Sequence, residues 1–92
     1  MVIMQNVPNK LSQLRDLTGL SQYQLSFFFG VSQTAYSYWE SGRHTPRDKH
    51  IDVITSFYQV PKADFMHGET DRLVTQVFSS GVLNVIRGRK SG

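Results

Sequence analysis

The sequence predicts a mainly α-helical protein: a compact domain of five short helices over residues 9–68, followed by a short C-terminal extension over residues 69–92. Three observations support this fold class. Apolar residues recur three or four positions apart along most of the chain, which is the period of an α-helix. Glycines and prolines divide that pattern into segments of helical length. The 92 residues amount to one domain and contain no cysteine, so packing must stabilise it.

The first helix is expected to begin near Asn9. Residues 1–8 show no periodicity and Pro8 marks a boundary, so these residues are expected to form a flexible N-terminus. An apolar stripe then follows at three-residue spacing, made of Leu11, Leu14 and Leu17. Gly19 is a typical helix terminator and ends the segment.

Two short helices joined by a glycine are expected between residues 20 and 42. Ser21 and Ser32 are good N-caps for the two helices, and Gly30 can adopt the left-handed conformation that ends the first. The residues expected to face inward are Leu25 and Phe29 in the first helix, and Tyr36 and Trp39 in the second. The outer face of the second helix is left polar.

Two further helices are expected after an exposed basic loop at residues 43–47. The first should run from about Arg47 to Tyr58, with Asp48 placed favourably for the helix dipole. Its inward face consists of Ile51, Ile54 and Tyr58. Pro61 then interrupts the helix, and a short fifth helix should follow and end at Gly68.

The extension at residues 69–92 is the segment whose secondary structure is least determined. Its apolar pairs alternate with polar pairs, which favours an amphipathic helix starting near Thr70. Its β-branched residues flank Gly81, which is also typical of a hairpin. A helix is slightly favoured. The extension is expected to serve dimerisation or to cover the core.

The formal charge of +3 comes from the end of the chain. Ten basic residues stand against seven acidic ones, and three of the ten basic residues, Arg87, Arg89 and Lys90, lie in the tail at residues 87–92. Without them the body carries seven charges of each sign. The overall charge is therefore weak support for a basic face on the body. The tail is either solvated or an arm that binds phosphate.

Several functional classes are not expected for this sequence. Its three histidines have no cysteine partners and no HExxH-like spacing, and neither a phosphate-cradling glycine loop nor an activated nucleophile motif is present. We therefore expect no catalytic residues, no metal and no cofactor. The first residues lack the pattern of a signal peptide, and no apolar run approaches about 18 residues. A cytoplasmic protein that does not enter the membrane is expected.

A helix, a glycine turn and a second helix with a polar outer face form the layout of a helix-turn-helix DNA reader. Residues 11–67 resemble the lambda-repressor-like domain of the Xre/Cro family of phage repressors and bacterial regulators. The resemblance is carried by Leu14, Arg15, Leu20, Ser21, Gln22, Leu25, Gly30, Val31, Ser32, Ser37, Glu40, Gly42, Pro46, Ile51, Ile54 and Val60. It implies a sequence-specific double-stranded DNA-binding transcriptional regulator, typically a repressor, acting beside the nucleoid of a bacterial or phage-infected cell.

The resemblance also implies roles for individual residues. The base-reading positions are Gln33, Thr34, Ser37 and Tyr38. The phosphate-binding positions are Gln22, Ser32, Arg43, His44, Thr45 and Arg47. The side chains suit these roles, because an amide can bond adenine at two points and a threonine methyl can pack on thymine. Without the resemblance, the same residues would be read as ordinary solvated side chains.

Arg15 and Glu40 match a pair that forms a partly buried salt bridge in similar repressors. Such a pair adds little net stability, but removal of one partner leaves the other charge stranded. We therefore expect Glu40 to be structural rather than catalytic. Tyr36 and Trp39 are expected to be core residues rather than groups that stack on bases.

The sequence departs from the family at two apolar surfaces. Phe27 and Phe28 occupy positions that are normally polar, and Val53 and Phe57 form a second apolar stripe on the fourth helix. Our hypothesis is that residues 69–86 pack on one surface while the other makes a homodimer contact. A dimer would place two recognition helices about 34 Å apart on an inverted-repeat operator. The alternative is a protein-binding adaptor or antitoxin that engages a partner protein through the aromatic surface or the C-terminal segment.

Overall fold

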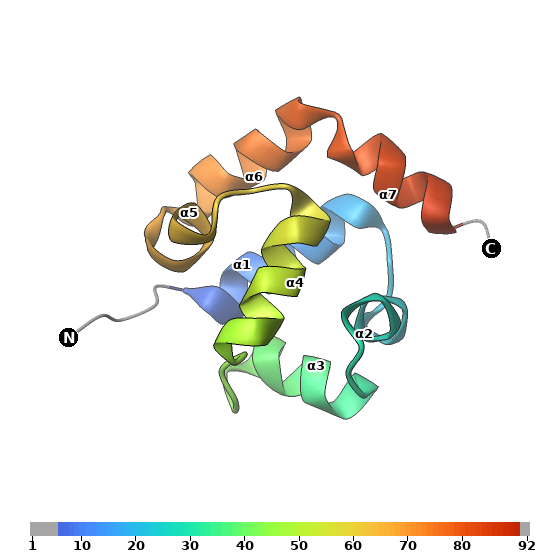
Figure 1. Cartoon of the computed structure of the whole chain (residues 1–92), viewed down its shortest axis with the longest axis vertical. Helices are drawn as coiled ribbons and strands as arrows, with labels where there is room; N and C mark the ends of the chain where they lie inside the picture. Colours follow the sequence, from blue (N-terminus) through green and yellow to red (C-terminus); the bar gives the residue numbers. More distant parts are fainter. Residues whose placement is uncertain (1–5, 91–92) are drawn as a thin grey trace.

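The computed structural model describes residues 6–90, with side chains through residue 88, and this part of the chain forms seven helices (Figure 1). They are α1 (Val7–Thr18), α2 (Gln22–Phe29), α3 (Gln33–Ser41), α4 (Asp48–Tyr58), α5 (Lys62–His67), α6 (Thr70–Ser80) and α7 (Val82–Lys90). No strand occurs among the described residues. The mainly α class is confirmed. Most of the expected flexible N-terminus and the end of the basic tail lie outside the described residues.

Helix α1 begins at Val7, two residues before the expected start. Pro8 lies inside its first turn, where proline is well tolerated because the N–H groups of that turn have no partner within the helix. Val7 is buried and belongs to the core. The boundary expected at residue 8 therefore lies within the helix.

The core draws at least one buried side chain from every helix. Its members are Val7, Leu11, Leu14, Leu20, Leu25, Phe29, Tyr36, Trp39, Ile51, Ile54, Tyr58, Val60, Phe65, Leu73, Val77, Val82, Leu83 and Ile86. The inward-facing residues expected for the first four helices are all in or against this cluster, with Leu17 only partly buried. Every helix within residues 6–90 is too short or too polar to span a bilayer.

The extension forms two helices, so the preference for helix over hairpin is correct. The single helix expected there is divided at Gly81, which has φ 85° and joins α6 to α7. Both helices pack chiefly on α1 and on each other, forming an arch at the end of the molecule opposite α3 (Figure 1). Their buried residues complete the core. The hypothesis that the extension packs on the Phe27 or Val53 surface is therefore replaced by packing on α1.

The first residue of the basic tail is attached to the body. Arg87 belongs to α7, and its Nη2 donates to the backbone oxygen of Leu17 at 3.1 Å. Leu17 lies in the last turn of α1, where carbonyl groups lack partners within the helix and attract a cation. Arg87 thus caps α1 instead of extending away as an arm.

A lysine is buried beneath α5. Lys10 has no exposed surface, and its Nζ donates to the backbone oxygen of Phe65 at 2.7 Å. Burial lowers the pKa of this ammonium group. The long stem of Lys10 therefore packs in the core, while its charged end satisfies a carbonyl near the end of α5.

Candidate nucleic-acid interface

Local hydrogen bonds fix the start of α2 and of α3. Ser21 and Gln24 form a capping box: the Ser21 hydroxyl accepts from the Gln24 backbone N–H at 3.0 Å, and the Gln24 side chain accepts from the Ser21 N–H at 2.9 Å. Gly30 ends α2 with φ 73°, a conformation that favours glycine. The Ser32 hydroxyl then accepts from the backbone N–H of Ala35 at 3.0 Å. These contacts set the angle at which α3 leaves the turn.

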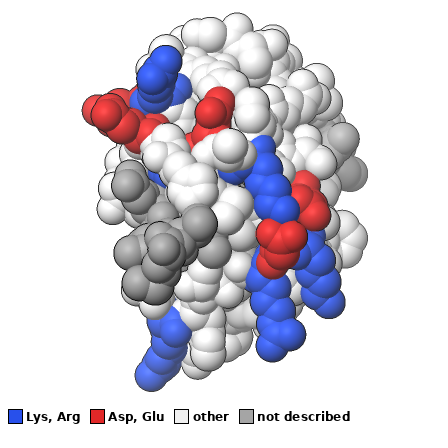
Figure 2. All heavy atoms as spheres, turned by 60° about the vertical axis from the view of Figure 1, so that its left-hand side comes forward, with Lys and Arg blue, Asp and Glu red and all other residues white. Residues whose placement is uncertain are grey.

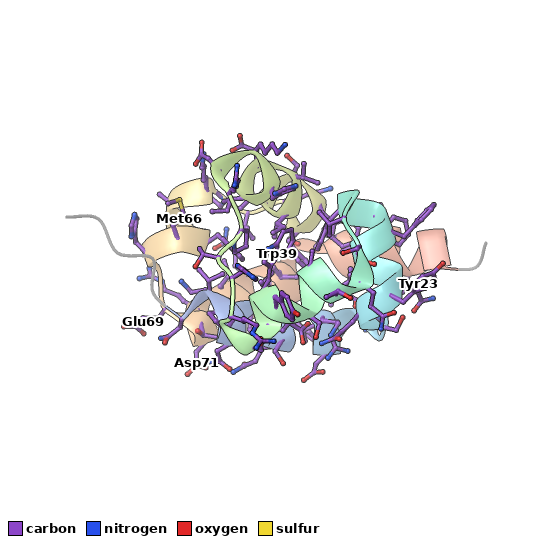
Figure 3. All side chains as sticks on the ribbon, turned by 90° about the horizontal axis from the view of Figure 1, so that it is seen from below. Tyr23, Trp39, Met66, Glu69 and Asp71 are labelled. Atoms are coloured by element: carbon purple, nitrogen blue, oxygen red, sulfur yellow. The ribbon has the colours of Figure 1, made fainter. Side chains whose placement is uncertain are left out.

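Helix α3 divides into an inner and an outer face as its period predicts. Tyr36 and Trp39 are buried, whereas Gln33 and Thr34 are exposed on the first turn. Ser37 and Tyr38, one turn later, are half-buried. Figure 3 looks onto this end of the molecule and shows Trp39 near its centre, with Tyr23 projecting from α2 at one edge. The polar start of α3 is thus presented to solvent.

An open hollow of about 420 Å³ lies between α3 and the chain that leads into α4. It is lined by Val31, Ser32, Thr34, Ala35, Tyr38, Trp39, His44, Thr45, Arg47 and His50. We call it the α3 hollow. Six of the residues expected to contact DNA therefore border one concave surface. The other four, Gln22, Gln33, Ser37 and Arg43, lie outside its lining, and Arg43 lies over the ring of Tyr38.

The charges at this end of the molecule are mostly basic. Figure 2 shows Lys and Arg side chains projecting from the lower end, where α3 and the 43–47 loop lie in Figure 1, with acidic side chains above them. Arg43 and Arg47 are both exposed. Basic side chains therefore cluster locally at this end, although the total charge of the body is balanced.

Glu40 joins three helices at the back of α3. Its Oε2 accepts from Arg15 Nε at 2.7 Å, and its Oε1 accepts from Arg15 Nη2 at 3.3 Å and from Gln22 Nε2 at 3.0 Å. The side chain of Glu40 is 8% exposed. Burial alone would raise the pKa of the carboxyl, but the pKa is held below its ordinary value, first by the hydrogen bond from Arg15 and also by the hydrogen bond from Gln22 and the positive charge of Arg15.

Gln22 therefore has a partner within the protein as well as an expected partner in DNA. An amide nitrogen carries two protons, so one can bond Glu40 while the other remains available to an acceptor. The side chain is half-buried at the start of α2. No local sequence pattern predicts the bond to Glu40, because the two residues lie on different helices.

The two apolar surfaces noted in the sequence are one continuous surface. Phe28 on α2 and Phe57 on α4 lie against each other with ring centroids 5.6 Å apart, and Phe27 contacts Phe28 edge-on at 6.0 Å. Phe27 is 75% exposed and Val53 is 42% exposed. We call these four residues the aromatic surface. Phe28 and Phe57 pack on one another, and Phe57 also lies edge-on against Phe29 with ring centroids 5.2 Å apart.

Sequence reasoning missed two residues near these sites. Tyr23 is 63% exposed on α2, four positions before Phe27, and that spacing should have placed both on one face. His50 stacks on Trp39 at 5.2 Å and borders the α3 hollow. No periodic signal marks His50 as part of the site. No cluster of side chains suited to a metal ion occurs in the described part of the chain.

Comparison with known proteins agrees with this geometry. The Helix-turn-helix family matches residues 11–65, more than half of the chain. The chain is also similar to the HTH-type transcriptional activator BcrR of Enterococcus faecalis, at 40% identity over 60 residues, which are 65% of this chain and 29% of BcrR. The chain thus spans less than a third of that relative. No solved structure gives a significant match. The chain belongs to the Xre/Cro-like helix-turn-helix family of DNA-binding transcription regulators.

Proposed function

We propose that this protein recognises a specific double-stranded DNA sequence by placing α3 in the major groove. The observation that carries the proposal is the α3 hollow, where Thr34 and Tyr38 share one open surface with His44, Thr45 and Arg47. A reading helix and a basic loop on one concave face suit a duplex, because base edges and phosphates must be contacted together. No step of this role requires a cofactor or catalysis.

We propose Gln33 and Thr34 as the main base readers. Both are exposed on the first turn of α3, the part of a recognition helix that reaches base edges in this motif. Gln33 can bond adenine at two points, and Thr34 can offer its hydroxyl or its methyl group. Ser37 is half-buried and lies one turn further along. It would allow close approach to the duplex and make at most one base contact.

Phosphate contacts are proposed on both sides of α3. Gln22 would donate its second amide proton, and the hydroxyl of Ser32 can donate while it caps α3. The basic loop supplies the remaining contacts through Arg43, His44, Thr45 and Arg47, all of them exposed. Such contacts fix the register of the protein and make its affinity depend on salt.

A homodimer is proposed to form through the aromatic surface. Phe27 is 75% exposed and lies beside further apolar side chains, and protein interfaces typically bury such a surface. Two copies would then read an inverted repeat with half-sites about one helical turn apart. Sedimentation tests this: wild type should dimerise at micromolar concentration, and Phe27→Ser should be monomeric. Phe78→Ser, which changes an exposed phenylalanine on α6, is the control; a monomeric wild type would refute the dimer.

Regulation is proposed to occur by occupation of a promoter in the cytoplasm, which gives repression. The relative BcrR carries the name of an activator, so a reporter assay must be able to detect either sign. The reporter carries, over its promoter, the operator obtained by selecting bound duplexes from a random pool. Its expression should fall when this protein is produced. Increased expression from the same reporter would replace repression by activation.

The central experiment is selection of bound duplexes from a random pool at a stated salt concentration. Wild type should enrich one motif, and Gln33→Ala should relax the preference at one position by about 1–3 kcal/mol. Gln76→Ala is the matched control, because it removes an exposed glutamine from α6. Failure of folded wild type to enrich any motif would refute sequence-specific binding.

The competing proposal is a protein-binding adaptor or antitoxin. It is favoured by the exposure of Tyr23 and Phe27 on one face of α2. A Gln33→Ala, Thr34→Ala double variant separates the two proposals. Loss of operator discrimination together with loss of regulation in cells supports DNA reading, whereas retained regulation in cells supports the adaptor.

A further inference from the structure

We infer that Tyr38 is a positioning residue, whose ring holds Arg43 and His44 in place for phosphate and does not itself choose a base. This inference rests on the proposed DNA binding. It changes the role of a residue that the family resemblance marks as a base reader. It also gives the basic loop an anchor on the recognition helix.

The geometry of the loop supports this role. The rings of Tyr38 and His44 have centroids 5.1 Å apart at an interplanar angle of 37°, and Cζ of Arg43 lies 5.0 Å from the Tyr38 ring centroid. The backbone N–H of His44 also donates to the backbone oxygen of Tyr38 at 3.3 Å. Two neighbouring loop residues are thus held by one ring on α3.

The hydroxyl of Ser41 adds a second connection between the loop and the same residue. It donates to the backbone oxygen of Tyr38 at 3.2 Å and accepts from the backbone N–H of Arg43 at 3.4 Å. Further along, Pro46 is buried, so the loop is fixed at its far end as well. Between these points, Arg43 and His44 are exposed, and the Tyr38 ring limits the rotamers of both side chains.

Limiting those rotamers is what phosphate binding requires. A free arginine side chain loses much conformational entropy when it binds, and a side chain already held in place loses less. The ring quadrupole attracts the guanidinium group while its N–H groups remain free to donate. A Tyr38 ring that swung into the groove to read a base would give up both contacts with the loop.

The test compares Tyr38→Phe with Tyr38→Leu in the full chain, using the selected operator and a scrambled duplex over a range of salt. Tyr38→Phe keeps the ring and should bind both duplexes within about twofold of wild type. Tyr38→Leu should weaken binding to both duplexes by about fivefold and reduce the salt slope by about one. Base preference should not change in either variant.

A double-mutant cycle supplies a readout that a general structural defect would not give. Combined with Arg43→Ala, the Tyr38→Leu change should cost clearly less affinity than it costs alone. A Tyr38→Leu variant that loses preference at one base position with an unchanged salt slope would overturn the inference, as would additive losses in the cycle. Absence of duplex binding by wild type would instead refute the proposed function itself. The two failures can be told apart, because this one is seen with the wild-type protein and the failure of the inference is seen only in the variants.

Discussion

Arg15 on α1 and Glu40 at the end of α3 form a two-point ion pair across 25 residues of sequence, with Nε–Oε2 at 2.7 Å and Nη2–Oε1 at 3.3 Å. Gln22 on α2 donates to the same carboxylate. One side chain therefore ties the recognition helix to both preceding helices. Because Gln22 is also a proposed phosphate contact, this network would link the stability of the domain to the geometry of the proposed DNA-binding surface around α3.

Glu40→Ala should destabilise the domain by about 2–4 kcal/mol, because it leaves the partly buried guanidinium of Arg15 without its partner. Arg15 is 24% exposed, so water will compensate only in part. Urea unfolding measures the change, and Asp16→Ala, which removes an exposed carboxylate from α1, is the control. An unchanged free energy of unfolding for Glu40→Ala would show that the pair contributes nothing.

The same carboxylate should make stability depend on pH in the acid range. The folded state holds the pKa of Glu40 below its ordinary value of 4.5, so the folded state binds fewer protons than the unfolded state there. The stability that ionised Glu40 contributes is complete above about pH 4.5, and it is lost as the pH falls through the pKa of Glu40 in the folded state. The stability difference between wild type and Glu40→Gln, measured by urea unfolding, should therefore shrink below pH 4.5. A difference that stays constant down to pH 3 would contradict this assignment.

Lys10 should contribute to stability as a core residue does, because its side chain is buried, which is unusual for a lysine. Lys10→Ala removes a buried stem and leaves the Phe65 carbonyl without its donor, so we expect a loss of about 2–4 kcal/mol. Lys10→Met keeps most of the packing and should lose less than half as much. Thermal and urea unfolding measure both variants. The control is Lys49→Ala, at an exposed lysine on α4, which should change stability by less than about 0.5 kcal/mol. If Lys10→Ala changed stability as little as Lys49→Ala does, the packing role of Lys10 would be refuted.

Much of the fold is encoded in periods and caps that act over a few residues. The three-to-four spacing identified the inward faces of α1 to α4, and the serine caps and Gly30 located the turn before α3. Periodicity identifies a buried face but not the surface that covers it. For that reason the packing of α6 and α7 on α1, and the contact of Phe28 with Phe57, could not be predicted.

The candidate site divides in the same way. The exposure of Gln33 and Thr34 follows from their positions on α3 relative to Tyr36 and Trp39. The stacking of His44 on Tyr38 does not follow from sequence positions, because the 43–47 loop has no periodic pattern and its path depends on tertiary contacts. Loops that carry function are therefore the part of such a site that sequence reasoning describes least well.

The extension should stabilise the domain through α1 and leave the DNA face unchanged. Ile86→Ala removes a side chain that is 1% exposed, so we expect a loss of about 2–4 kcal/mol from the transfer and cavity terms. Phe78→Ala removes a larger side chain from the same extension, but one that is 68% exposed, and should change stability by less than about 0.5 kcal/mol. Urea unfolding distinguishes the two, and operator affinity measured well below the melting temperature should match wild type for both. Equal stability of the two variants would show that α7 does not pack on α1 in solution, whereas reduced affinity of folded Ile86→Ala would show that the extension also acts on the DNA face.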